Sequence, residues 1–148
     1  AATGSGLGWA LSGPFRYGIG GPGGWVILDE PELHLGAEPD ILVPDLAGWR
    51  RERMPHVPRA AFVELAPDWA CEVLSPSTQK LDRAEKMQAY LLEQVRHVWL
   101  VDPLEQIVEV YRHGGDAWIR AAIRHGAGRV RVEPFDAVEL DLAKLWAD

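Results

Sequence analysis

Residues 69–102 read WACEVLSPSTQKLDRAEKMQAYLLEQVRHVWLVD, and this stretch decides the fold. Its first six residues, WACEVL, form an apolar run that predicts a buried strand, and the loop SPSTQK follows. Apolar side chains at helical spacing predict a helix over 81–94, for which Ser77 or Thr78 is a candidate N-cap. HVWLVD at 97–102 predicts a second buried strand. A strand, a helix and a strand in succession form a βαβ unit, so part of the sheet should be parallel.

Shorter extended segments flank this unit on both sides. The strand candidates before it are WVIL, ELHL, the run at 45–49 and a short piece at 62–65. The candidates after it are IVEVYR, AWIRAAI and RVRVE, and ELDLAKLW predicts a short closing helix. We therefore predict the α/β class, with a mixed β-sheet flanked by helices.

Residues 1–24 are rich in glycine and predict an irregular lead-in, with no helix expected. The run GIGGPGG at 18–24 matches G-x-G-x-x-G in form only, because that dinucleotide motif must open a helix. Here a proline interrupts the motif and the strand-like WVILDE follows it. Cofactor binding is therefore not predicted from these glycines.

The chain of 148 residues is long enough for one domain and too short for two, so we assign a single domain to 25–148. Hydrophobic residues make up 47% of the chain. No uninterrupted apolar run approaches the ~18 residues that a membrane-spanning helix needs. Cys71 is the single cysteine, which excludes an internal disulfide and a cysteine-based zinc site. These features predict a soluble protein of the reducing cytoplasm, without a membrane partner.

Acidic residues outnumber basic ones by 22 to 15, giving a net charge of −7. That balance argues against the broad basic surface of a typical nucleic-acid binder. A phosphate-bearing partner would need local help, from a metal ion held by carboxylates or from clustered arginines. Arg50, Arg51 and Arg53, beside His56 and Arg59, form such a cluster in the sequence.

Two acids occupy positions that suggest chemistry. Pro44 places Asp45 at the entrance of its strand, because proline is tolerated at the first residue of a strand and not in its middle. Glu72 stands inside the apolar run WACEVL, where a carboxylate is costly unless it is paired, hydrogen-bonded or bound to a cation. An ion pair to an arginine, or a sheet face open to water, would also explain Glu72.

A lysine on the following helix, Lys86, completes an Asp, Glu, Lys set with Asp45 and Glu72. Two carboxylates can hold a hard cation such as Mg²⁺, which lowers the pKa of its bound water and neutralises charge on a phosphate. A lysine can orient that water or stabilise the developing negative charge. The set therefore suits metal-assisted hydrolysis of a phosphodiester bond.

At these residues the sequence resembles the Uma-two family, a bacterial group of the PD-(D/E)XK nuclease superfamily. The resemblance covers nearly everything from 25 to 148 and implies a restriction-endonuclease-like core with a C-terminal strand extension. It is carried by VPDLAGWR, PDWACEVLSPST, DRAEKMQAY, VRHVWLVDP and VEVYR.

The resemblance also implies roles for individual residues. Asp45 would be the PD acid and Glu72 the acid of (D/E)XK, and both would bind Mg²⁺ or Mn²⁺ together with the backbone carbonyl of Val73. Leu74 stands where the superfamily has its lysine, so the resemblance assigns that role to Lys86. Lys80, in the preceding loop, is the fallback.

Members of the family usually begin with a further helix and hairpin that include an early acidic residue. The resemblance leads us to expect that this chain starts after them, which puts activity in question. A sheet shortened in this way would also leave an exposed edge strand.

Other candidates are supporting or weaker. Asp82 is four residues before Lys86 and could hold it, while Tyr90 could pack beside the lysine or bond to it. Asp40 also follows a proline, but its strand would contain Pro44 internally, so Asp45 is preferred. A further pair of weak candidates for ligands alternates on one predicted strand: Glu32 and His34.

We predict a metal-dependent endonuclease acting on DNA, with a possible homodimer. The alternative keeps the fold without catalysis, as a module that binds nucleic acid or a protein partner. The net charge of −7 favours this alternative slightly, because unaided phosphate binding would be repelled.

Overall fold

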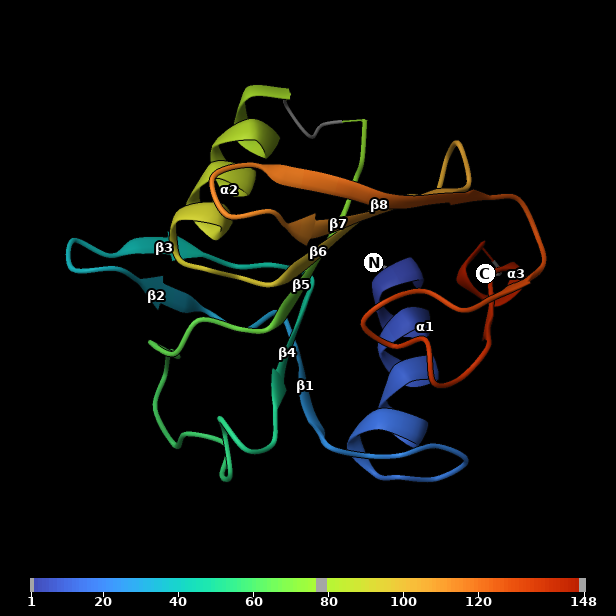
Figure 1. Cartoon of the computed structure of the whole chain (residues 1–148), viewed down its shortest axis with the longest axis horizontal. Helices are drawn as coiled ribbons and strands as arrows, with labels where there is room; N and C mark the ends of the chain where they lie inside the picture. Colours follow the sequence, from blue (N-terminus) through green and yellow to red (C-terminus); the bar gives the residue numbers. More distant parts are fainter. Residues whose placement is uncertain (1, 77–79, 147–148) are drawn as a thin grey trace.

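The computed structural model describes residues 2–76 and 80–146, so Ser77 and Thr78, the predicted N-cap residues, lie outside the described part. The predicted βαβ unit forms the centre of the molecule (Figure 1). Strand β5 (Trp69–Val73) leads to helix α2 (Lys80–Leu92), and strand β6 (His97–Asp102) returns parallel to β5. Their register places Glu72 beside Leu100.

A six-stranded sheet surrounds this unit in the order β1-β4-β5-β6-β7-β8. Its other strands are β1 (Trp25–Asp29), β4 (Leu46–Arg50), β7 (Ile107–His113) and β8 (Trp118–His125). The pair β5 and β6 is parallel, and the remaining neighbours are antiparallel. The predicted α/β class with a mixed sheet is therefore confirmed.

Small elements complete the fold. Strands β2 (Leu33–Leu35) and β3 (Asp40–Leu42) form a hairpin, and β9 (Arg129–Val130) pairs with β10 (Leu140–Asp141). The chain continues into the short helix α3 (Ala143–Trp146), as the sequence predicts.

One predicted strand and the expectation about the strand of Asp40 differ in the structure. The segment at 62–65 makes only an isolated bridge, between Leu33 and Val63, because one pair of backbone hydrogen bonds joins it to β2. Asp40 begins the short strand β3, which ends at Leu42 before Pro44. The proline is therefore not internal to that strand, contrary to the expectation.

The predicted irregular lead-in is wrong for its first half. Helix α1 (Ala2–Leu11) and a π-helical turn (Ser12–Arg16) occupy this region, so a helix does precede β1. Leu7 and Leu11 lie four residues apart on α1 and are almost fully buried against the sheet. Packing thus outweighs the poor helix propensity of the glycines.

Glycine also lets α1 approach the sheet closely. A Cβ at Gly8 would lie 3.0 Å from Oδ1 of Asp29 and 3.2 Å from Leu46. The run at 18–24 forms a turn that leads directly into strand β1, so it opens no helix. These glycines therefore lack the following helix that the dinucleotide motif requires.

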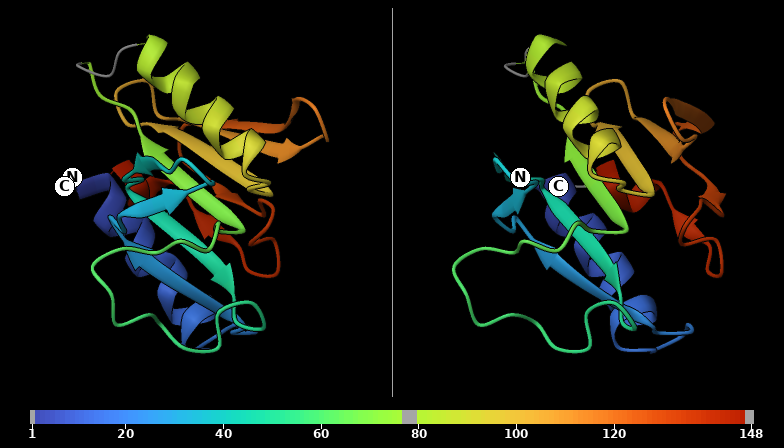
Figure 2. Two further views of the ribbon diagram at one scale, coloured as in Figure 1. Left: turned by 90° about the vertical axis from the view of Figure 1, so that its left-hand side faces the viewer. Right: turned by 60° about the vertical axis from the view of Figure 1, so that its left-hand side comes forward.

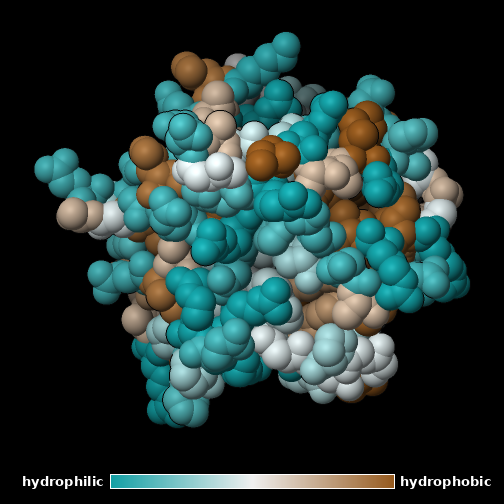
Figure 3. Space-filling view, viewed as in Figure 1, coloured by the Kyte–Doolittle hydropathy of each residue, from teal (hydrophilic) through white to brown (hydrophobic). Residues whose placement is uncertain are grey.

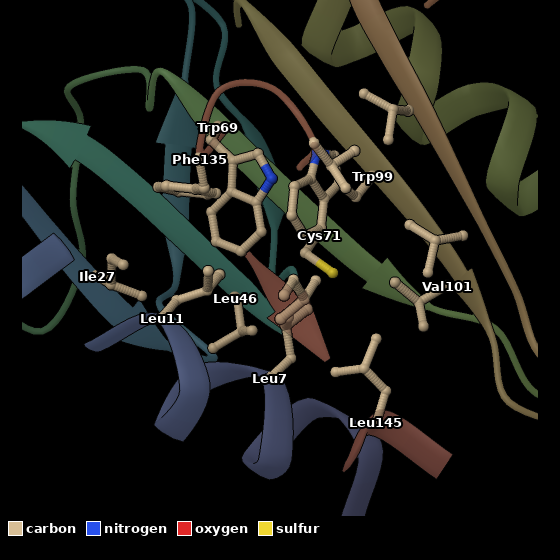
Figure 4. Close-up of a cluster of buried hydrophobic side chains, with 14 of the residues drawn as sticks. Leu7, Leu11, Ile27, Leu46, Trp69, Cys71, Trp99, Val101, Phe135 and Leu145 are labelled. Atoms are coloured by element: carbon tan, nitrogen blue, oxygen red, sulfur yellow. The ribbon is translucent and has the colours of Figure 1, made fainter. Parts of the chain in front are cut away.

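Separate hydrophobic cores cover the two faces of the sheet. Figures 1 and 2 show α2 on one face and α1 with α3 on the other. On the α1 face the rings of Trp69, Trp99 and Phe135 meet edge to face, and Leu7 and Leu145 pack nearby (Figure 4). Alternation along β5 therefore points Cys71 into the α1 core and Glu72 towards α2.

The surface is consistent with burial of most apolar side chains. The face drawn in Figure 3 is largely hydrophilic, with small, separate hydrophobic areas. Across 2–76 and 80–146, no helix has the length and apolar character needed to cross a membrane.

We expect Leu7→Ala to lower the free energy of unfolding by ~2–5 kcal/mol, because it opens a cavity between α1 and the sheet. Trp9→Ala on the same helix is the control, since this side chain is 87% exposed and its loss should matter by less than ~0.5 kcal/mol. Urea denaturation measures both. Equal effects of the two substitutions would contradict the docking of α1.

Candidate active site

The backbone of β5 fixes the carboxylate of Asp45. Asp45 immediately precedes β4, and its N–H donates to the carbonyl of Cys71 at 3.0 Å. The N–H of Val73 in turn donates to Oδ2 of Asp45 at 2.7 Å. These reciprocal bonds hold the first predicted acid beside the strand that carries the second.

Helix α2 provides both partners of the buried Glu72 carboxylate. The hydroxyl of Tyr90 donates to Oε2 at 2.7 Å, and Nζ of Lys86 donates to Oε1 at 3.2 Å. Lys86 and Tyr90 are four residues apart and therefore share one face of the helix. The arginine partner considered for Glu72 is thus replaced by a lysine and a tyrosine.

Burial and charge shift the protonation equilibria of this cluster. Burial raises the pKa of Glu72 above its usual 4.5, the bonds from Tyr90 and Lys86 oppose this rise, and Asp45 adds to it. Burial alone would lower the pKa of Lys86, but attraction to Glu72 and then to Asp82 raises it above 10.5 overall. Lys86 is therefore a cation at neutral pH.

Tyr90 is held in its neutral form. Burial, followed by the nearby charge of Glu72, raises the pKa of its hydroxyl well above 10. The hydroxyl thus remains a hydrogen-bond donor at physiological pH.

The two acids and the lysine line one cavity of about 170 Å³. Its wall includes Val73, whose predicted role uses its backbone carbonyl, and Leu74 at the position of the superfamily lysine. The complete lining is Val43, Asp45, Glu72, Val73, Leu74, Asp82, Arg83, Lys86, Met87 and Leu100. The structure therefore brings the predicted Asp, Glu, Lys set together in a single pocket.

Arg83 is a member of this wall that the sequence reasoning missed. It lies three residues before Lys86, so both side chains project from the same face of α2. That spacing is the signal that could have revealed it. This second cation partly offsets the charge of the three carboxylates that line the pocket.

The supporting candidates divide into two groups. Asp82 lines the pocket, with Oδ2 at 3.7 Å from Nζ of Lys86, while Tyr90 lies behind Glu72. Lys80, at the start of α2, is exposed and does not line the pocket. Lys80 is thus poorly placed for the fallback role.

The weak ligand candidates lie elsewhere. Nε2 of His34 is 2.8 Å from a carboxylate oxygen of Glu32, and the His34 ring stacks on Phe62 at 3.9 Å. Neither these residues nor Asp40 line the pocket of Glu72.

The donor set fits a hard divalent cation. Mg²⁺ commonly binds one or two carboxylates and keeps several water ligands, so Asp45 and Glu72 could hold it with the carbonyl of Val73. Within the described ranges 2–76 and 80–146, no group of three or more His, Cys, Asp or Glu residues could hold a metal. A cation here would therefore depend on water for much of its coordination.

Tyr90→Phe should raise the pKa of Glu72 further, because it removes a hydrogen bond that stabilises the carboxylate. A folded-state pKa above the unfolded value means that stability is greatest at low pH and is lost as the pH rises through the folded pKa. The variant should consequently lose about 1–3 kcal/mol at pH 7 and less at pH 4.

Carboxyl NMR titration and urea denaturation at both pH values measure these effects. Tyr111→Phe is the matched control, since its hydroxyl bonds to Glu109 at 2.6 Å instead of Glu72. An unchanged Glu72 titration in Tyr90→Phe would refute the assigned role of Tyr90.

Comparisons with known proteins agree with this fold. Residues 18–143 match the model of the Uma2 family, described as "Putative restriction endonuclease". A crystal structure from Anabaena variabilis, titled as "a putative nuclease belonging to DUF820", superimposes with a TM-score of 0.76 at 23% identity. The match covers 98% of this chain and 78% of that one, and shows a shared fold. No curated protein matched the chain. Because the family model spans most of its length, the chain belongs to the Uma2 family.

Proposed function

We propose that the protein is a metal-dependent endonuclease that hydrolyses DNA phosphodiester bonds. The observation that carries this proposal is the meeting of Asp45, Glu72 and Lys86 in one pocket. The description of the Uma2 family and the nuclease title of the structural neighbour support the reaction class.

The residues have distinct roles in this proposal. Asp45, Glu72 and the carbonyl of Val73 would hold Mg²⁺ or Mn²⁺, which supplies an activated water and stabilises negative charge on the phosphate. Tyr90 and the β5 backbone orient the two carboxylates. Lys86 acts through its charge, since its raised pKa keeps the ammonium protonated.

Arg83 offers a further contact for the substrate. Its guanidinium can bind phosphate oxygens in a bidentate manner, and it lies on the same wall as Lys86. A bound divalent ion together with these two cations would outweigh the three carboxylates of the pocket wall and give it local attraction for phosphate, despite a net charge of −7.

Supercoiled plasmid should be cleaved in the presence of Mg²⁺ or Mn²⁺ and remain intact in chelator. Asp45→Asn, Glu72→Gln and Lys86→Met should each reduce cleavage at least ~100-fold, since each removes a ligand or a stabilising charge. Agarose gels with plasmid and single-stranded DNA as substrates provide the measurement.

Lys144→Met is the control for a lysine outside the pocket, because Lys144 is exposed on α3. It should cleave at the wild-type rate. An intact plasmid with the folded wild-type protein and either metal would favour the non-catalytic binding module instead.

Metal binding can be tested without activity. Mn²⁺ should bind the wild type at one site, observed by calorimetry or by loss of its free electron paramagnetic resonance signal. Asp45→Asn and Glu72→Gln should abolish this binding because each removes one of two carboxylates. Wild-type binding retained in both variants would place the ion elsewhere.

Glu72→Gln should leave the thermal midpoint unchanged or higher, because the amide relieves a desolvated charge while keeping its shape. Its amide can still pair with Tyr90 and Lys86. A large loss of stability would instead indicate that the carboxylate is mainly a structural partner of Lys86. The homodimer and the cytoplasmic location stay predictions.

A further inference from the structure

A second hollow, of about 310 Å³, lies at the other end of the sheet from Glu72. Asp45 precedes β4, whereas Arg50 ends it, a separation of five residues that at ~3.3 Å per residue is about 16 Å. The ends of five strands and the residues next to them supply its lining, which includes Trp25, Arg50, Asp68, Arg96, Arg112 and His113. We propose that this arginine hollow binds a phosphate group, independently of the proposed nuclease site.

The acids near the arginine hollow are already paired. Asp68 accepts a hydrogen bond from the backbone N–H of Arg50 at 2.8 Å and lies 2.9 Å from Nη1 of Arg53. Glu133 binds Nε and Nη2 of Arg112 at 2.9 and 2.7 Å. Arg53 therefore neutralises Asp68, and Arg112 neutralises Glu133. The positive charges of Arg50 and Arg96 remain.

Those two guanidinium groups have donors available for a ligand. Within the described residues, neither side chain donates a hydrogen bond to a protein acceptor. The guanidinium of Arg50 lies over the ring of Trp25 at 4.4 Å from its centroid, which supports its flat face and leaves its N–H edge free. Arg96 projects from the residue before β6 and is exposed.

Neighbouring groups make the hollow rigid and do not cancel its charge. The N–H of His97 donates to the carbonyl of Asp68 at 3.0 Å, and the N–H of His113 donates to the carbonyl of Arg96 at 2.9 Å. Nε2 of His113 bonds to the carbonyl of Leu91 at 2.9 Å while its Nδ1 accepts from a backbone N–H. Both ring nitrogens of His113 are therefore engaged within the protein, and Nε2 of His97 contacts Glu133.

The chemistry favours phosphate over other ligands. Two unneutralised guanidinium groups on a fixed frame suit an oxyanion that can accept several N–H bonds at once. The hollow has two excess positive charges in a protein of net charge −7, so an anion is the ligand that gains most there. The phosphate could belong to nucleic acid or to a free phosphate compound.

The first experiment titrates pyrophosphate into the full chain by calorimetry, with chelator present to exclude metal. We expect one site, and affinity about tenfold weaker in Arg50→Gln and again in Arg96→Gln. Arg129→Gln, an exposed arginine on β9 outside the hollow, should bind as the wild type does. Circular dichroism melting verifies that each variant is folded.

Lys86→Met separates this site from the proposed nuclease pocket. Pyrophosphate affinity should be unchanged in that variant, whether or not the protein cleaves DNA. Loss of binding in Lys86→Met with wild-type affinity in Arg50→Gln would overturn the proposal.

A second arm identifies the source of the phosphate, using a 5′-phosphorylated DNA duplex with chelator. Weaker duplex binding in Arg50→Gln and Arg96→Gln, with competition by pyrophosphate, would assign the hollow to nucleic acid. Wild-type duplex binding in both variants, with weakened pyrophosphate binding, would assign it to free phosphate compounds. Absence of an arginine-dependent effect in both arms would overturn the proposal.

Discussion

The buried carboxylate of Glu72 is the constraint on which the site depends. Its position on β5 would be unfavourable without the bonds from Tyr90 and Lys86, which both come from α2. The same bonds therefore stabilise an ionisable group in the core and fix α2 over the end of the sheet. A cation bound at Glu72 would have to share oxygens that are already engaged, so metal binding and the position of Lys86 are coupled.

Sequence reasoning identified the central unit because its signals were local. The apolar run of β5 indicates a strand within five residues, and the helical spacing of apolar residues indicates α2 within a few turns. Helix α1 was not predicted, because its glycines suggest a loop. Its stability comes from contacts of Leu7 and Leu11 with strands that are distant in the sequence. Tertiary packing of this kind leaves little trace in local composition.

The site was predictable to a similar degree. Asp45 and Glu72 stood out because a proline and an apolar run made their positions chemically unusual. Arg83 was overlooked because an arginine on a polar helix face is ordinary until the pocket beneath it is known. In the same way, the arginines at 50, 51 and 53 look like one cluster, yet only Arg50 joins Arg96 and Arg112 in the hollow.

Leu74 explains why the cation comes from the helix. Its side chain packs with the core beneath α2, so this part of the pocket wall is apolar and provides no charge. Lys86 can supply this charge only while α2 keeps its position along the sheet and its rotation about its own axis. The hydrogen bond from Nε1 of Trp118 on β8 to the carbonyl of Met87, at 2.9 Å, restrains that rotation from the far side. The position of Lys86 thus depends on how α2 packs against the sheet. The backbone of the strand alone would have positioned a lysine at 74.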